Sequence, residues 1–147
     1  MSQIKSRQRV KEKGEVFTRK QEIKAMLNQI PDICKKTKFL EPSCGNGNFL
    51  IEILKYKLRT TNKDDLSLLM CLCTTYAVDI MTDNVLEAKL RLHRYIKKLG
   101  YSERVLESSA LILTNNIQCA DFLKDKIMFC DYIFNDDLTF NTIWSEV

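Results

Sequence analysis

The chain has 147 residues, of which 45% are hydrophobic and 29% charged, and its net charge is +4. These values are typical of one globular domain that can bury about two-thirds of its surface, and they exclude a disordered chain. The most apolar stretch, residues 66–80, is too short and too often interrupted by polar residues to span a bilayer, and no signal peptide opens the chain. We therefore expect an intracellular, cytoplasmic protein with no membrane partner.

The positive charge is concentrated at the start of the chain. Residues 1–38 contain eleven Lys or Arg and four acids, whereas the other 109 residues contain twelve and fifteen. We divide the chain into a basic N-terminal arm, residues 1–13, and one domain, residues 14–147. The arm could neutralise DNA phosphates; its candidate contacts are Lys5, Arg7, Arg9, Lys11 and Lys13. The alternative is a solvated, partly disordered N-terminus.

The first predicted elements surround a turn with two glycines. Residues 14–18 read as a loop, and Thr18 is a candidate N-cap for a helix that runs to about Ile30. A strand at residues 39–40 precedes the turn. A helix follows from Asn48, because its apolar residues recur at helical spacing.

The remaining pattern continues to alternate between helix and strand. A buried helix is expected at residues 66–73, a strand at 75–80, and a long helix from Thr82 or Asp83 that Gly100 ends. A short helix at 102–108 and weaker strands at 111–113, 117–120 and 132–134 complete the prediction. The alternation predicts an α/β fold, with a mostly parallel sheet and helices on both faces.

The glycine turn is the strongest functional signal. Residues 41–50 read Glu-Pro-Ser-Cys-Gly-Asn-Gly-Asn-Phe-Leu. Such a turn offers backbone N–H groups and a helix N-terminus to an anionic group. A dinucleotide motif would have a third glycine where Leu50 stands, so NAD is disfavoured. Because Glu41 precedes the turn, we expect a nucleotide-like cofactor that also carries a cation.

Three acids follow the predicted strands. Ligands of parallel α/β sheets bind at the carboxyl ends of the strands. Glu41, Asp79 and Asp121 stand at such ends, where Asp79 could accept ribose hydroxyls. The alternatives are that Asp79 is a turn or capping acid and that Asp121 caps a helical fragment through Lys124.

The cysteines do not indicate a metal site. Six are present, and their only close pair is Cys71 and Cys73. Zinc sites usually have paired ligand spacings, so buried free thiols are the preferred interpretation and no metal is expected.

Residues 41–50 resemble the cofactor motif of S-adenosylmethionine-dependent DNA adenine methyltransferases. Residues 14–18 are similar to the segment that covers the methionine end of the cofactor in the gamma arrangement of that family, although Arg19 replaces its usual proline. Residues 78–80 and 120–122 are similar to its next two motifs. The resemblance implies a Rossmann-like methyltransferase fold and a set of residues that bind S-adenosylmethionine: Phe17, Thr18, Glu41, Pro42, Cys44, Gly45, Asn46, Gly47, Phe49, Asp79, Ile80, Asp121 and Phe122. Phe17 and Thr18 could instead only staple the first helix.

The catalytic motif of this family is degenerate here. The family uses Asn-Pro-Pro-Tyr, whose asparagine and aromatic ring hold a flipped adenine. This chain has Asn135-Asp-Asp-Leu138, so only Asn135 has a counterpart, and it is the candidate catalytic residue. The nine residues after Leu138 are too few for a target-recognition domain.

The resemblance implies an adenine-N6 DNA methyltransferase of the restriction-modification type. One alternative is a non-catalytic subunit that binds S-adenosylmethionine or DNA and works with a partner subunit of such a system. A second alternative is a methyltransferase that acts on RNA or protein.

Overall fold

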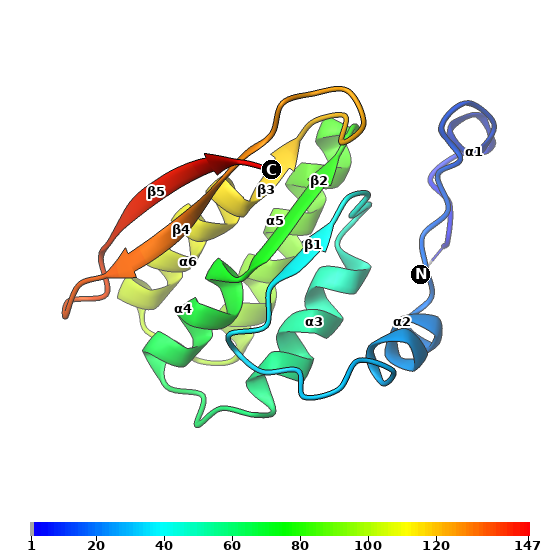
Figure 1. Ribbon diagram of the computed structural model, residues 1–147. Helices are drawn as coiled ribbons and strands as arrows, with labels where there is room; N and C mark the ends of the chain where they lie inside the picture. Colours follow the sequence, from blue (N-terminus) through cyan, green and yellow to red (C-terminus); the bar gives the residue numbers. More distant parts are fainter. Residues whose placement is uncertain (1) are drawn as a thin grey trace.

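The computed structural model describes residues 2–147 and has a mixed α/β architecture. Its main sheet contains three parallel strands in the order β1-β2-β3 (Figure 1). Two further strands, β4 and β5, form a separate antiparallel hairpin. The strand bounds are β1 Phe39–Glu41, β2 Thr75–Asp79, β3 Ile117–Cys119, β4 Met128–Phe134 and β5 Phe140–Glu146.

The parallel strands are connected through helices, as the sequence predicts. The chain passes from β1 through α3 and α4 to β2, and from β2 through α5 and α6 to β3. The helix bounds are α1 Arg7–Lys13, α2 Lys20–Leu27, α3 Asn48–Leu58, α4 Asp65–Cys73, α5 Thr82–Lys98 and α6 Glu103–Asn116. None of the helices within residues 2–147 combines the length and apolar character needed to cross a membrane.

Alternation along β2 separates two of the three core clusters within residues 2–147; the third lies between α2 and α3. Ala77 faces the large cluster formed by α3, α4, α5 and α6, which includes the predicted inward residues of α5. Tyr76 and Val78 point to the opposite face, where they pack with Ile127 and Phe129. The Tyr76 and Phe129 rings lie 4.9 Å apart between centroids. Strand β2 therefore buries both of its faces, but against different kinds of element.

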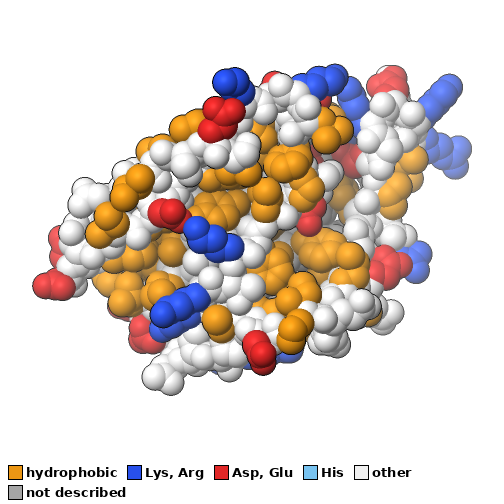
Figure 2. Space-filling view, viewed as in Figure 1, with side chains coloured by type: hydrophobic (Ala, Val, Ile, Leu, Met, Phe, Trp, Pro, Cys, Tyr) orange, Lys and Arg blue, Asp and Glu red, His pale blue; other side chains and the backbone are white. Residues whose placement is uncertain are grey.

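The prediction of helices on both faces is wrong for the described chain. Helices α3, α5 and α6 lie behind the strands in Figure 1, whereas the hairpin lies beside β3 and over α6. Of its described residues, only Phe129 at its start packs, with the preceding Ile127, on the front face of β2. Hydrophobic side chains remain visible on this front face in Figure 2, and Leu40 is 40% exposed. Residues 120–127, between β3 and β4, form a turn and a loop and supply no covering helix.

Several element bounds also differ from the prediction. Residues 111–113 belong to α6, not to a strand, because Ile112 and Leu113 continue the buried face begun by Val105 and Leu106. Helix α2 begins after Arg19, whose N–H donates to the Glu22 carboxylate, and it ends at Leu27. The expected strand at 132–134 is the end of the longer β4.

The second half of the N-terminal arm, Arg7–Lys13, forms helix α1. Ser6 accepts a hydrogen bond from the N–H of Arg9 and starts α1, and Gly14, at φ 64°, ends it in the left-handed conformation. Helix α1 contains no buried residue. Its position therefore depends on polar contacts.

Candidate functional site

The glycine bend between β1 and α3 has the conformation that its sequence predicts. Gly45 and Gly47 have φ values of 52° and 88°, which favour glycine. A Cβ atom on Gly47 would lie 3.0 Å from the Cα and Cβ of Ala88 on α5. The absence of a side chain at Gly47 therefore allows α3 and α5 to approach each other beneath the bend.

Asp79 holds this bend in place. It is buried at the end of β2, and its Oδ2 accepts a hydrogen bond of 2.8 Å from the N–H of Gly45. Its Oδ1 accepts from the N–H of Met81 at 2.8 Å and from Asn84 Nδ2 at 3.3 Å. This is the structural role that the sequence left open for Asp79. Any ribose contact would have to share these two oxygens.

Glu41 lies at the end of β1. Its Oε1 accepts a hydrogen bond from the N–H of Ser43. Burial raises the pKa of Glu41, and the neighbouring Asp79 charge adds to the rise. Two carboxylates near one bend favour a ligand that brings positive charge.

Cys44 is not a nucleophile in this environment. Burial raises the pKa of its thiol to about 12, with a further contribution from the Asp79 charge. The thiolate is the reactive form of cysteine, so Cys44 stays protonated and inert near neutral pH. Its side chain serves as part of the apolar core.

The N-terminal segment covers the bend. We call residues 2–18 the strap. The Phe17 N–H donates to the carbonyl of Gln3 at 2.7 Å, and the Phe17 ring is 7% exposed. A Cβ on Gly45 would lie 3.0 Å from this ring, so Phe17 packs directly on the bend. The Asn48 side chain, at the start of α3, donates to the carbonyl of Thr18 at 3.0 Å.

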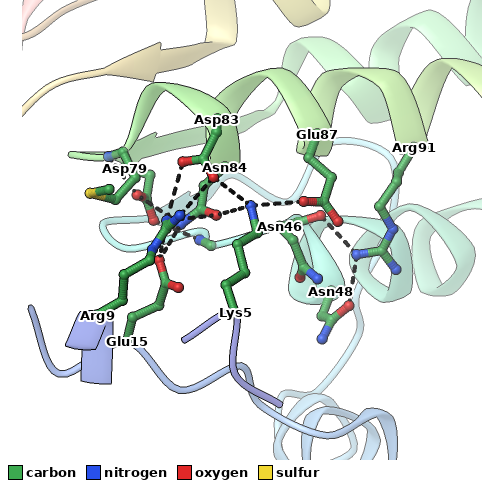
Figure 3. A network of polar contacts seen from close by, with 12 residues as sticks. Lys5, Arg9, Glu15, Asn46, Asn48, Asp79, Asp83, Asn84, Glu87 and Arg91 are labelled. Atoms are coloured by element: carbon green, nitrogen blue, oxygen red, sulfur yellow. Dashed lines mark hydrogen bonds and ion pairs between the residues drawn. The ribbon is translucent and has the colours of Figure 1, made fainter. Parts of the chain in front are cut away.

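Ion pairs fasten the strap to the first turns of α5 (Figure 3). Lys5 Nζ lies 2.9 Å from both Asp83 Oδ2 and Glu87 Oε2. Arg9 Nη1 lies 2.7 Å from Asp83 Oδ2, and Arg9 Nη2 lies 2.6 Å from Glu15 Oε2. Hydrogen bonds from Arg9 and then from Lys5 hold the pKa of Asp83 well below its ordinary value. The hydrogen bond to Asp83 likewise raises the pKa of Arg9.

Glu15 is a site residue that the sequence reasoning missed. Its Oε2 accepts hydrogen bonds from Arg9 and from Asn84 Nδ2. Its Oε1 is buried and has no hydrogen-bond partner within residues 2–147. Glu15 lines the same cavity as Phe17 and Asp79. The only sequence signal was an acid two residues before Phe17 in the segment that resembles a cofactor lid.

Arg91 was also missed. Its Nη1 donates at 2.8 Å to the carbonyl of Asn46 and to Asn48 Oδ1 (Figure 3). The guanidinium therefore connects α5 to the bend. Because both acceptors lie in the bend or at the start of α3, Arg91 fixes the geometry at which α3 begins.

These elements enclose a cavity of about 120 Å³ between the strap and the ends of β1 and β2. A second cavity, of about 380 Å³, shares Phe17, Thr18 and Asn48 in its lining. The structure brings together in the first cavity these residues from the predicted set: Phe17, Thr18, Cys44, Gly45, Asn46, Phe49, Asp79 and Ile80. The other predicted cofactor residues, Glu41, Pro42, Gly47, Asp121 and Phe122, do not line it.

Asp121 and Phe122 have local roles. The carbonyl of Asp121 accepts from the N–H groups of Lys124 and Asp125, and its Oδ1 accepts from the N–H of Leu123. The alternative was that Asp121 caps a helical fragment through Lys124; the structure has Asp121 bonded to this segment, which is a turn and not a helix. Phe122 packs with the Tyr76 and Val78 cluster on the front face of the sheet.

Asn135 lies away from the cavity. It begins the tight turn between β4 and β5, where its N–H and side-chain amide both donate to Thr139. Gln118 in β3 donates to the carbonyl of Met128, whereas Asn116, just before β3, accepts from Tyr132. Strand β4 thus runs opposite to β3 and carries Asn135 toward the amino ends of the parallel strands. The prediction that Asn135 acts beside the cofactor motifs does not fit this arrangement.

The predicted DNA contacts divide into two groups. Lys5 and Arg9 are engaged with acids of α5 and the strap. Arg7, Lys11 and Lys13 are exposed and form no ion pair within the described chain.

The six cysteines are free; Cys44, Cys71 and Cys130 are buried as predicted, whereas Cys119 is exposed. No group of three His, Cys, Asp or Glu that could hold a metal occurs in residues 2–147.

Comparisons with known proteins add no relative. No family model matches the chain, and no curated protein and no solved structure matches it either. The functional argument therefore depends on the site itself.

Proposed function

We propose that this chain is the S-adenosylmethionine-binding, Rossmann-like domain of an adenine-N6 DNA methyltransferase. The observation that carries the proposal is the cavity that Phe17 of the strap, Gly45 of the bend and Asp79 of β2 line together. It lies between a glycine bend, the start of α3 and the acidic end of β2, at the carboxyl edge of a parallel sheet. This edge is where ligands of such sheets bind.

The chemistry of the site suits a cationic nucleoside. S-Adenosylmethionine carries a sulfonium and an ammonium group, and it supplies an activated methyl group when bound. The carboxylates of Glu15 and Asp79 line the cavity, and that of Glu41 lies outside it at the end of β1; together they favour positive charge near the bend. Ile80 lines the cavity, is 46% exposed and offers an apolar surface to a flat ring. The site therefore offers carboxylates for the cationic groups of the cofactor and an apolar side chain for its adenine ring.

The cavity does not fit the cofactor in size. Sites for ligands of this size are typically about 300–1,000 Å³, whereas the cavity under the strap is about 120 Å³. The strap must therefore move before the cofactor enters.

The proposed DNA substrate accords with the charge of the arm. Arg7, Lys11 and Lys13 are exposed on α1 and can approach phosphates without breaking an ion pair. Their contacts would position the duplex without reading its sequence.

Calorimetric titration with S-adenosylmethionine tests the cofactor assignment, with NAD as the control nucleotide. The informative variant is Ile80→Ala, because Ile80 is exposed and its loss should leave the fold intact. Leu123→Ala is the matched control, since Leu123 is 90% exposed and lies outside the cavity. We expect Ile80→Ala to weaken binding about three- to tenfold, and Leu123→Ala to bind as the wild type does. No binding at millimolar S-adenosylmethionine would refute the proposal.

A second candidate function is a non-catalytic cofactor- or DNA-binding subunit. The position of Asn135 in the β4–β5 turn favours it, because no asparagine then faces the cavity from the end of β4. Methyl transfer from labelled S-adenosylmethionine to unmethylated DNA by the purified chain separates the two candidates. Transfer would exclude the non-catalytic subunit, and cofactor binding without transfer would favour it.

A further inference from the structure

The strap carries Phe17, which covers the glycine bend at the candidate cavity, and it also carries two cations of the basic arm, Lys5 and Arg9. We propose that a nucleic-acid phosphate backbone opens the cavity by drawing Lys5 and Arg9 away from α5. This inference rests on the proposed function, since it assigns the regulation of the same site.

Electrostatic contacts hold the first part of the strap. Helix α1 has no buried residue, so apolar packing does not attach it to the domain. This part of the strap is attached to α5 through Lys5, which precedes α1, and Arg9, which lies in α1; they contact Asp83, Asn84 and Glu87 (Figure 3). The Asp83 side chain is 51% exposed, so salt and competing anions can reach this contact. Partly exposed ion pairs are individually weak, and a multivalent anion can replace them.

The second part of the strap closes the cavity. Phe17 is the buried side chain of the strap, and it lies on Gly45. Glu15 is connected to α1 directly, because Arg9 binds Glu15 Oε2 and Asp83 Oδ2 at the same time. Withdrawal of Arg9 leaves the Glu15 carboxylate, within residues 2–147, with the single hydrogen bond from Asn84 Nδ2, which loosens Glu15 and the segment that carries Phe17. Since Phe17 lines both cavities, its displacement would join the spaces of about 120 Å³ and 380 Å³.

A phosphate backbone is the fitting competitor. Arg7, Lys11 and Lys13 face solvent beside the paired cations and can receive the first phosphates. A chain of phosphates then competes with three carboxylates, those of Glu15, Asp83 and Glu87, for Lys5 and Arg9. Once the strap is released, the carboxyl ends of β1 and β2 become accessible, so that DNA binding and cofactor entry are coupled.

Hydrogen exchange of the strap, with and without a short DNA duplex, tests the opening step. The N–H of Phe17 is the reporter, because it donates to Gln3 within the closed strap. The informative variant is the double substitution Lys5→Gln with Arg9→Gln. The matched control is Arg7→Gln with Lys11→Gln, which removes the same charge from the same segment without touching an ion pair.

We expect saturating duplex to accelerate exchange of the wild-type strap on the order of tenfold. The Lys5 and Arg9 variant should exchange at that faster rate without DNA and bind S-adenosylmethionine about three- to tenfold more tightly than the wild type. The control should keep the slow exchange in the absence of DNA.

Two outcomes overturn the inference: strap protection that saturating duplex leaves unchanged, or slow exchange in the Lys5 and Arg9 variant. The exchange measurement needs no cofactor. If DNA releases the strap but S-adenosylmethionine never binds the double variant, the proposed function fails while the opening step stands.

Discussion

The contact between Gly47 and Ala88 predicts how sensitive the bend is to a single methyl group. In Gly47→Ala the new Cβ would lie 3.0 Å from the Cα and Cβ of Ala88, closer than ordinary van der Waals contact. The backbone there has φ 88°, which also disfavours alanine. The left-handed conformation costs about 1–2 kcal/mol, and crowding in a packed interior costs about 1–3 kcal/mol. We therefore expect a loss of about 2–5 kcal/mol in the free energy of unfolding.

Gly100→Ala is the matched control for the backbone contribution. Gly100 has φ 84°, close to that of Gly47, but a Cβ there would meet no atom within 4 Å. This variant should lose only the conformational part, about 1–2 kcal/mol. Urea unfolding followed by far-ultraviolet circular dichroism gives both values under one condition. Equal losses in the two variants would refute the argument that α3 and α5 meet too closely at Gly47 for a side chain.

Three further predictions concern buried or paired polar groups. Lys57 is fully buried, and burial lowers its pKa from 10.5 to about 8. Between pH 8 and pH 10.5 the unfolded chain therefore binds more protons than the folded one. The stability of the wild type should rise with pH across this range relative to that of Lys57→Met, by at most about 3 kcal/mol. An unchanged difference between the two denaturation curves over that range would contradict it. Asn116→Leu should lose about 2–4 kcal/mol in urea unfolding, because two carbonyls and the Tyr132 hydroxyl lose their partner; Tyr132→Phe should lose less, and the reverse order would exclude this network. Finally, Arg9 and Lys5 lower the pKa of Asp83, so its contribution is complete above its ordinary pKa of 3.8 and is lost as the pH falls toward the lowered value. Wild type and Asp83→Asn should therefore converge in stability in acid, and curves that stay parallel would contradict the pairing.

The sequence predicted the elements whose pattern is local. Helices α3 and α5 were expected close to their observed positions, because burial on one side produces a periodic run of apolar residues. Helix α4 and strand β2 were expected there because each is a short, nearly continuous apolar run that becomes buried. The glycine bend was also expected, since two glycines between a strand and a helix allow a backbone that other residues disfavour. The position of Asp79 beside this bend followed from the parallel order of β1 and β2.

The secondary-structure prediction failed where a short apolar run fits both a helix and a strand. The prediction for Asn135 failed because the direction of β4 depends on residues that are distant in the sequence. Residues 111–113 are apolar enough for a strand, but the helical face begun by Val105 continues through them. The hairpin sets Asn135 at the far end of the sheet because β4 pairs with β5 and runs against β3. Nothing in the local sequence of β4 distinguishes that direction from the parallel one.

The sequence by itself determined the glycine bend, the strands that end in acids and the charge of the arm, because each depends on neighbouring residues. Only the tertiary structure decided that the arm lies on α5, that Glu15 enters the cavity and that Asp121 does not. Arg9 and Asp83 are 74 positions apart in the chain. Such a pair forms only when the fold brings both side chains to one surface, and no local pattern encodes that distance.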